Sequence, residues 1–290
     1  DETALYNHVT EYLEREALHA LPNSQRQLIT LVLRKLLASS TFAIAGALET
    51  LTNRLKKALA EKASTLDKGA DNGRGLIDEL DEDFETLDEI AEEIDELPVD
   101  DAQARTKEQV QAIAQEIEDL EGFRKLAVSI TENAKGTALL QALKVAFAKL
   151  DELGAAKKAI IFTESRRTQD YLMGLLAATP YNDGVVLFNG TNNDAASKRI
   201  YADWIKRHAG TDRITGSRTA DTRAALVEHF REFNGPDGSI MIATEAGAEG
   251  INLQFCSLLI NYDLPWNPQR VEQRIGRCHR YGQKIDVTVI

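Results

Sequence analysis

Five short runs of apolar residues, separated by stretches with helical periodicity, limit most strongly the folds that this chain can adopt. They lie at 159–162, 185–188, 240–243, 258–261 and 287–290. Such alternation is typical of a parallel sheet whose strands are joined by crossover helices. The second half is therefore predicted to be an open α/β lobe, with helices at about 166–178, 195–209, 220–234 and 268–280. Ligands of such a lobe are expected beyond the carboxyl ends of its strands.

The first 150 residues carry helical periodicity almost throughout and predict an all-α region. Three helices are expected, around Leu5 to Leu13, after Asn23-Ser24, and from Ser40-Thr41 onward. The 290 residues, 43% of them apolar, are enough for one large or two ordinary globular domains. We expect a helical region over 1–70, a distinct segment over 71–134 and the α/β lobe over 135–290.

The segment between Arg74 and Arg105 contains fourteen acidic residues and neither Lys nor Arg. Without those fourteen charges the net charge of −12 becomes +2, so the acidity is local. Apolar residues recur at steps of three and four over 76–97 and 110–120, which predicts a coiled-coil-like antiparallel helical hairpin with the carboxylates on its solvated face. A binding surface for a protein partner is the alternative for this acidic face.

One string within this acidic segment has a catalytic counterpart elsewhere. Asp78-Glu79-Leu80-Asp81 matches the acidic string that holds magnesium in many nucleoside triphosphatases. Such a string should follow a buried strand, and residues 73–77 do not form one. We therefore assign it to the helix.

The two cysteines, Cys256 and Cys278, lack the spacing of a disulfide framework or a zinc site, and no metal site is predicted. The chain contains neither about 18 consecutive apolar residues nor a signal segment, so a soluble cytoplasmic protein without membrane contact is expected. Because the chain begins with Asp-Glu-Thr, we expect it to be part of a longer polypeptide.

The loops after the third and fourth apolar runs hold the residues most informative about function. Thr244 to Leu253 follows one run, and Tyr262 to Pro268 follows the other, leading into a helix with the string Gln273-x-x-Gly-Arg-x-x-Arg280. Arg277 and Arg280 are three residues apart and project from one side of a helix. Two guanidinium groups so arranged suit a polyphosphate.

In combination these strings resemble the second RecA-like lobe of superfamily-two helicases and translocases, most closely the Swi/Snf-type group and its bacterial relatives. The resemblance covers about residues 158–290. It rests on Ala159 to Ser165 (motif four), Asn189-Gly190, Thr244 to Leu253 (motif five), Trp266-Asn-Pro268, and Gln273 to Gln283 (motif six).

The resemblance implies that Arg277 and Arg280 are arginine fingers on the phosphates of ATP. It implies that Gly250, Asn252 and Gln273 lie beside the nucleotide. Contacts with a nucleic-acid backbone are implied for Thr163, Ser165, Arg166, Gly190 and Thr244. Similarity to the Swi/Snf-type group favours duplex DNA over RNA. Turn geometry alone is the alternative explanation for the glycines.

The chain departs from the complete family pattern because it contains no G-x-x-x-x-G-K-[ST] phosphate loop. ATP and Mg²⁺ are therefore expected to be bound mostly by a first lobe that precedes Asp1. The chain by itself is expected to be an inactive part of an ATP hydrolase.

A second departure is the 33-residue separation of Gly190 and Arg223, which indicates an insertion. Residues 198–223 carry seven basic and three acidic side chains. Lys198, Arg199, Lys206 and Arg207 are candidates for contacts with nucleic-acid phosphates. The alternative is a solvated helix with Trp204 packed inward.

The function predicted from these residues is the C-terminal lobe of an ATP-dependent nucleic-acid helicase or translocase. The alternative is a non-catalytic protein-interaction module on a helicase-like scaffold. A dinucleotide-binding dehydrogenase is excluded because no G-x-G-x-x-G follows any predicted strand.

Overall fold

The computed structural model describes residues 1–21, 26–60, 107–130, 133–265, 267–279 and 286–290. The chain divides into two compact units, Asp1–Asn133 and Ala134–Ile290. The Asp78–Asp81 string, the first arm of the expected hairpin, Trp266 and Arg280 lie outside the described residues.

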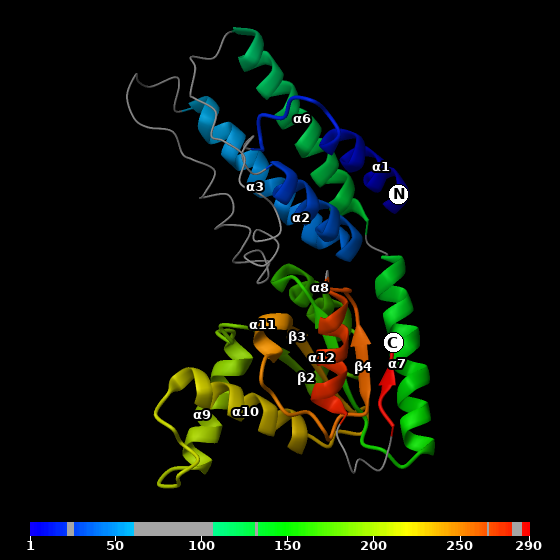
Figure 1. Ribbon diagram of the computed structural model, residues 1–290, viewed down its shortest axis with the longest axis vertical. Helices are drawn as coiled ribbons and strands as arrows, with labels where there is room; N and C mark the ends of the chain where they lie inside the picture. Colours follow the sequence, from blue (N-terminus) through cyan, green and yellow to red (C-terminus); the bar gives the residue numbers. More distant parts are fainter. Residues whose placement is uncertain (22–25, 61–106, 131–132, 266, 280–285) are drawn as a thin grey trace. The chain divides into compact units, whose positions relative to one another are not determined.

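The first unit is helical, as predicted (Figure 1). Its helices are α1 (Glu2–Leu13), α2 (Arg26–Ser39), α3 (Thr41–Ala60) and α6 (Lys107–Ser129), and their apolar faces form one core. Buried Glu116 of α6 accepts hydrogen bonds from the Tyr12 hydroxyl at 2.8 Å and from the backbone N–H groups of His19 and Ala20 at 2.8 and 3.0 Å. Because a buried carboxylate requires such donors, Glu116 ties α6 to α1 and to the segment after it.

The second arm of the expected acidic hairpin lies in α6. Ile113 and Leu120 of this arm are fully buried in the core that α6 shares with α1, α2 and α3. The hairpin hypothesis did not include this contact. The pairing of the two arms stays a prediction.

The second unit contains the predicted open parallel sheet. Its strands are β1 (Lys158–Thr163), β2 (Val185–Phe188), β3 (Ser239–Thr244), β4 (Leu258–Asn261) and β5 (Thr288–Val289). They are ordered β2-β3-β1-β4-β5, and all neighbours are parallel. All five predicted strands are present, and the last is shorter than its apolar run. The open α/β fold class is confirmed.

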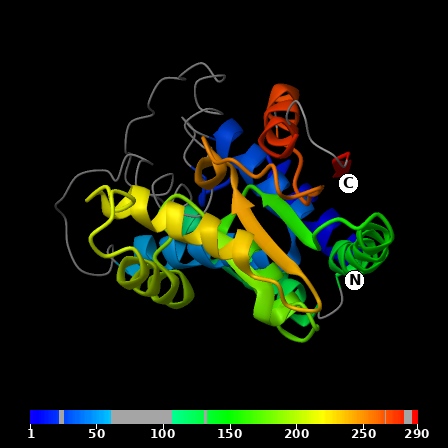
Figure 2. The ribbon, with the colours of Figure 1, turned by 90° about the horizontal axis from the view of Figure 1, so that it is seen from below.

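Helices cover both faces of this sheet (Figure 2). They are α7 (Ala134–Glu152), α8 (Arg166–Ala177), α9 (Ala195–Arg207), α10 (Arg218–Glu232), α11 (Glu245–Ala248) and α12 (Pro268–Cys278), with a short 3₁₀ turn at Asn182–Gly184. α7 and α8 pack against Ile161 and Ile242, whereas α10, α11 and α12 pack against Phe162 and Ala243. Successive strand residues point to opposite faces and both faces are buried, which explains the uninterrupted apolar runs. The four predicted helices are confirmed, and α11 was not predicted.

Both cysteines are buried free thiols. Among the described residues, no group of three or more His, Cys, Asp and Glu side chains is placed to hold a metal ion. None of the helices in the described ranges has the length and apolar character needed to cross a membrane.

Candidate functional site

The carboxyl ends of the parallel strands bring the candidate loops to one edge of the sheet. Gly247 lies where the loop after β2 meets α11, because a Cβ built on it would lie 2.6 Å from Cα of Asn189 and 2.8 Å from the carbonyl oxygen of Phe188. Only glycine fits this approach. Gly250 has a φ of +73° and open space around it, so it makes a left-handed turn at the surface.

Glu245, the first residue after β3, pairs with arginines of α12 at this edge of the sheet. Fully buried Arg274 of α12 donates from Nε to Glu245 Oε2 at 2.7 Å. Arg274 Nη1 also donates to Asn261 Oδ1 and to the carbonyl oxygen of Asp263, both at 2.9 Å, and its guanidinium lies 4.7 Å from the centre of the Phe162 ring. A charge buried this deeply is tolerated only with such partners. The network therefore fixes α12 to the carboxyl ends of β1, β3 and β4.

Arg277 lies one turn further along α12, on the same side. Its Nη2 is 4.0 Å from Glu245 Oε1, its side chain is 13% exposed, and its carbonyl oxygen accepts from the Leu253 N–H at 2.9 Å. Arg277 Nε, Arg274 Nη2 and Glu245 Oε1 have no hydrogen-bond partner within the described residues. Burial lowers the pKa of Arg277, while Glu245 and Glu249 act to raise it. A mostly buried guanidinium with an unpaired donor suits an anionic ligand.

The other residues predicted to lie beside a nucleotide are on the surface near this network. Gly250, Asn252 and Gln273 are exposed. Asn252 Oδ1 accepts from the Gln254 N–H at 3.2 Å, which closes a local turn. The pairing of Arg277 with Arg280 stays a prediction, because Arg280 lies outside the described residues.

The hydroxyl side chains predicted to touch nucleic acid are buried. The Thr163 hydroxyl donates to Asp263 Oδ2 at 2.6 Å. Ser165 caps α8 by accepting from the Arg167 N–H, and Thr244 caps α11 by accepting from the Gly247 N–H. Any contact of these three residues with a ligand would therefore use backbone groups. Gly190 is exposed and Arg166 is partly exposed.

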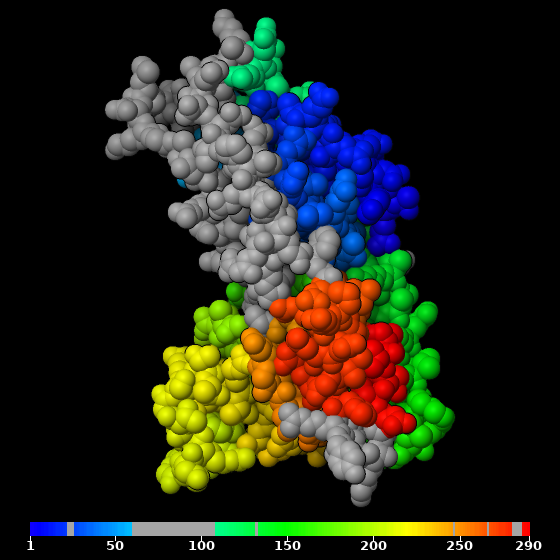
Figure 3. Space-filling view, viewed as in Figure 1, coloured from blue at the N-terminus to red at the C-terminus, as the bar shows by residue number. Residues whose placement is uncertain are grey.

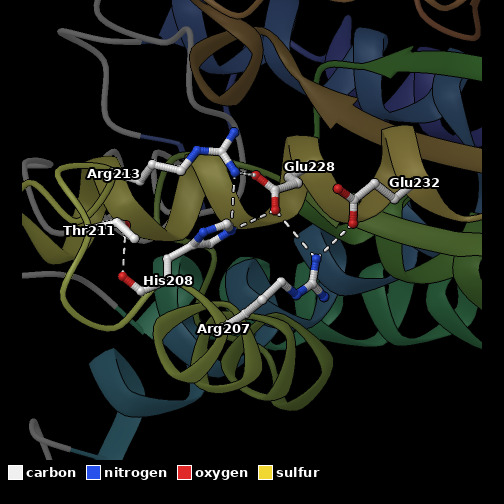
Figure 4. A network of polar contacts seen from close by, with 6 residues as sticks. All are labelled: Arg207, His208, Thr211, Arg213, Glu228 and Glu232. Atoms are coloured by element: carbon white, nitrogen blue, oxygen red, sulfur yellow. Dashed lines mark hydrogen bonds and ion pairs between the residues drawn. The ribbon is translucent and has the colours of Figure 1, made fainter.

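Two of the seven basic side chains of residues 198–223, Arg207 and Arg213, are tied to one buried carboxylate. Figure 4 shows Arg207, His208 and Arg213 converging on Glu228 of α10. The distances to the Glu228 oxygens are 3.4 Å from Arg207 Nη1, 2.8 Å from His208 Nε2 and 3.0 Å from Arg213 Nη1, and Arg207 also pairs with Glu232 at 2.7 Å. Burial raises the pKa of Glu228, but the hydrogen bond with His208 and the charge of Arg213 outweigh it and lower the pKa below its usual range. These side chains hold α9 and its following loop against α10.

The other side chains of α9 considered in the sequence analysis differ in exposure and in their partners. Lys206 lies 3.5 Å from Asp203 and is highly exposed, and Lys198 and Arg199 are exposed on α9. Trp204 is only 3% exposed, and its ring centre lies 4.8 Å from that of His208, with the two ring planes tilted by 57°. The inward-packed alternative for Trp204 is therefore the one found.

Comparison with known proteins shows the kind of domain that carries this geometry. Residues 170–282 match the helicase conserved C-terminal domain. The match runs from α8 to beyond α12 and so contains β2, β3, β4 and the Glu245–Arg274 network. The second unit therefore matches the helicase conserved C-terminal domain over most of its length.

The proteins with similar sequences include ATP-dependent helicases. The chain is 40% identical over 160 residues to the uncharacterized ATP-dependent helicase YqhH of Bacillus subtilis, covering 55% of this chain and 21% of the relative. It is 52% identical over 67 residues to the RNA polymerase-associated protein RapA of Vibrio cholerae, covering 23% of this chain and 7% of the relative. The crystal structure of the C-terminal part of the Fun30 ATPase domain is 17% identical, with a TM-score of 0.40 and coverage of 99% of this chain and 79% of that one.

These comparisons confirm the resemblance to superfamily-two helicases and translocases. The chain spans only about a fifth of the length of YqhH and less of RapA.

The motifs of the helicase domain did not single out Glu245 and Arg274. Both lie inside strings that the motifs covered, but neither was assigned a role there. One signal was present, because Glu245 directly follows a strand predicted to be buried and Arg274 lies one turn before Arg277. The cluster of Arg207, His208 and Arg213 around Glu228, called the Glu228 clamp below, had no comparable signal in the sequence.

Proposed function

We propose that this chain supplies the C-terminal lobe of an ATP-dependent nucleic-acid helicase or translocase, with Arg277 and Arg280 as arginine fingers. The observation that carries the proposal is the position of Arg277. A buried ion pair beside it holds α12 rigidly at the carboxyl edge of the sheet, while its own guanidinium keeps an open donor.

The residues around Arg277 fit a bound phosphate. Arg277 Nε and Arg274 Nη2 are buried donors without a partner in the described part of the chain. When bound, ATP with Mg²⁺ supplies the phosphoryl group that is transferred to water. The chain's own contribution is to hold the Arg277 charge in place beforehand, so that little reorganisation is needed when negative charge develops. Gly250, Asn252 and Gln273 are proposed to border the nucleotide.

Nucleic acid is the proposed polymer along which the complete protein moves. Gly190, Arg166 and the backbone around Thr163, Ser165 and Thr244 border the carboxyl edge of the sheet, where ligands of such folds bind. Lys198, Arg199 and Lys206 are exposed cations on α9 that are not held by Glu228, and Lys198 is the one proposed to contact a phosphate. Arg207 is proposed as a weaker contributor, since it pairs with both Glu228 and Glu232. The Swi/Snf-type resemblance favours duplex DNA.

A non-catalytic interaction module is the second candidate. It would need Arg277 only for its structural contacts. The unpaired donors of Arg277 and Arg274 together favour the catalytic proposal, because buried arginines with only structural contacts are expected to have their donors satisfied by the protein.

ATP turnover by the isolated chain and by the complete protein tests the proposal. The complete protein is expected to hydrolyse ATP, with stimulation by duplex DNA. The isolated 290-residue chain is expected to remain at background, because the fingers act only together with the phosphate loop and Mg²⁺. Hydrolysis by the isolated chain that survives Arg277→Ala would contradict the assignment. Stimulation by duplex RNA alone would mean that the nucleic acid bound by the complete protein is RNA and not DNA.

A further inference from the structure

A polar pocket of about 180 Å³ opens beside the N-terminal turns of α9. It is formed by the loop after β2, the first turns of α9 and the start of α10, and the surface of these helices is the yellow region of Figure 3. Its walls carry the cations Lys198 and Arg218, the hydroxyls of Thr191, Tyr201, Thr219 and Thr222, and two asparagine amides. None of the described residues that line it has a carboxylate.

The two cations of this pocket are not neutralised by the protein. Within the described residues, neither Lys198 nor Arg218 has an ion-pair partner, and the Arg218 guanidinium lies 5.9 Å from the centre of the Tyr201 ring. Arg207 and Arg213, by contrast, are held by Glu228. Lys198 and Arg218 therefore keep their positive charge available inside the pocket.

The nearest carboxylates already have hydrogen-bond partners within the fold. Asp194 caps α9 by accepting from the Ser197 N–H at 2.9 Å. Buried Asp221 accepts from the Thr215 N–H at 2.9 Å, from its hydroxyl at 2.7 Å and from the Gly216 N–H at 3.2 Å. Both groups maintain the shape of the pocket without lining it.

The pocket also faces the first turn of α10, which spans 15 residues from Arg218 to Glu232. The Ser217 hydroxyl caps the Ala220 N–H, while the other N–H groups of this first turn lack partners within the helix and the helix dipole adds positive potential there. Two free cations, hydroxyl donors and this potential meet in one concave site. This combination matches a phosphate group, which accepts several hydrogen bonds and carries negative charge.

We propose that this pocket binds one backbone phosphate of the nucleic acid. Lys198 and Arg218 of the insertion would contact this phosphate. The inference rests on the proposed function of the chain. It differs from a strip of phosphate contacts along α9, because Arg199 and Lys206 lie outside the pocket.

Binding of a labelled 20-base-pair DNA duplex to the 290-residue chain, measured by fluorescence anisotropy over a range of KCl concentrations, tests the pocket. Two double variants with the same loss of charge are compared: K198Q with R218Q in the pocket, and R199Q with K206Q on the same insertion outside it. The pocket pair is expected to reduce the log–log salt slope by about 0.9, the amount for one phosphate on duplex DNA. The matched pair is expected to leave the slope nearly unchanged. All four side chains are exposed, so thermal melting of both variants should match the wild type.

Equal changes of slope in the two variants, or no change in the pocket pair while the wild type still binds, would overturn the pocket and leave the proposed function intact. Failure of the wild-type chain to bind the duplex at all would contradict the proposed role in nucleic-acid binding itself. ATP titrated onto the same proteins identifies the source of the phosphate. A loss of ATP affinity in the pocket pair equal to its loss of duplex affinity would overturn the assignment to a backbone phosphate.

Discussion

Among single residues, Glu245 faces three arginines of α12, at 3.8 Å from Arg270, 2.7 Å from Arg274 and 4.0 Å from Arg277. Arg274 has no exposure to solvent, so it depends on this carboxylate and on two carbonyl-type oxygens for its charge. A buried charge that loses its partner cannot recover the lost energy from water. Glu245 therefore controls both the stability of this edge and the position of Arg277.

The first prediction follows from that dependence. Glu245→Gln is expected to lower the free energy of unfolding of the second unit by about 3–5 kcal/mol, because the amide leaves the Arg274 charge uncompensated. Glu152→Gln, which breaks the exposed Lys149–Glu152 pair, is the matched control and should cost at most about 1 kcal/mol. Urea denaturation of both variants measures the difference. Similar losses in the two would show that the buried pair contributes no more than a surface pair.

For some single residues the sequence predicted a specific role, and for others it predicted only that a basic side chain is present. Arg277 could be found because its motif spacing is specific. The role of Arg207 could not, because an arginine that binds phosphate and one that pairs with Glu228 look the same in a sequence. Glu245 and Arg274 were missed because charged residues are usually at the surface, and only three-dimensional packing shows that these two are buried together.

At the scale of elements, α9 is attached to α10 by packing as well as by charge. Trp204 lies between the helices, 3% exposed, and next to the Glu228 clamp. The tryptophan ring excludes water from the carboxylate, so the apolar contact and the ion pairs support each other.

The second prediction concerns this tryptophan. Trp204→Ala is expected to cost about 3–5 kcal/mol of stability, because it leaves a large cavity beneath α9. Its effect on single-strand binding, measured well below the melting temperature, should be small. A variant with wild-type stability and single-strand binding weakened by roughly 1–3 kcal/mol would instead mean that the ring stacks on bases.

The elements of the second unit could be predicted because their patterns are strong. Strands buried on both faces appear as uninterrupted apolar runs, as in 159–162 and 240–243. α11 escaped prediction because four residues are too few to show a helical period. β5 is only two residues long although its apolar run is longer, since pairing with β4 extends only over Leu258 and Leu259.

At the scale of the whole molecule, the two units have separate cores. The core of the first unit ends with residues of α6, and the two cores of the second unit begin with Leu139 of α7. No buried apolar residue of the described chain is assigned to the core of both units. Each unit should therefore be able to fold by itself.

The third prediction tests this independence. Residues 134–290 expressed alone are expected to unfold in one cooperative transition, because both of their cores are complete. Residues 1–106 expressed alone are expected to lack cooperative unfolding, because they miss α6 with Ile113, Leu120 and the Glu116 hydrogen bonds. Circular dichroism during heating distinguishes the outcomes. A molten second unit, or a cooperative 1–106 fragment, would refute the division.

Arginine fingers act between lobes, so their prediction also belongs to the whole molecule. The proposed finger role requires Arg277 to act on the phosphates of a nucleotide bound mainly by another part of the complete protein. The most direct measurement is the kcat for ATP hydrolysis by the complete protein and its Arg277→Ala variant, with the affinity for duplex DNA measured in parallel without nucleotide. The expected result is a fall in kcat on the order of 10³–10⁵ with little change in DNA affinity. A kcat that stays within a few-fold of the wild type, or an equal loss of DNA affinity, would contradict the account.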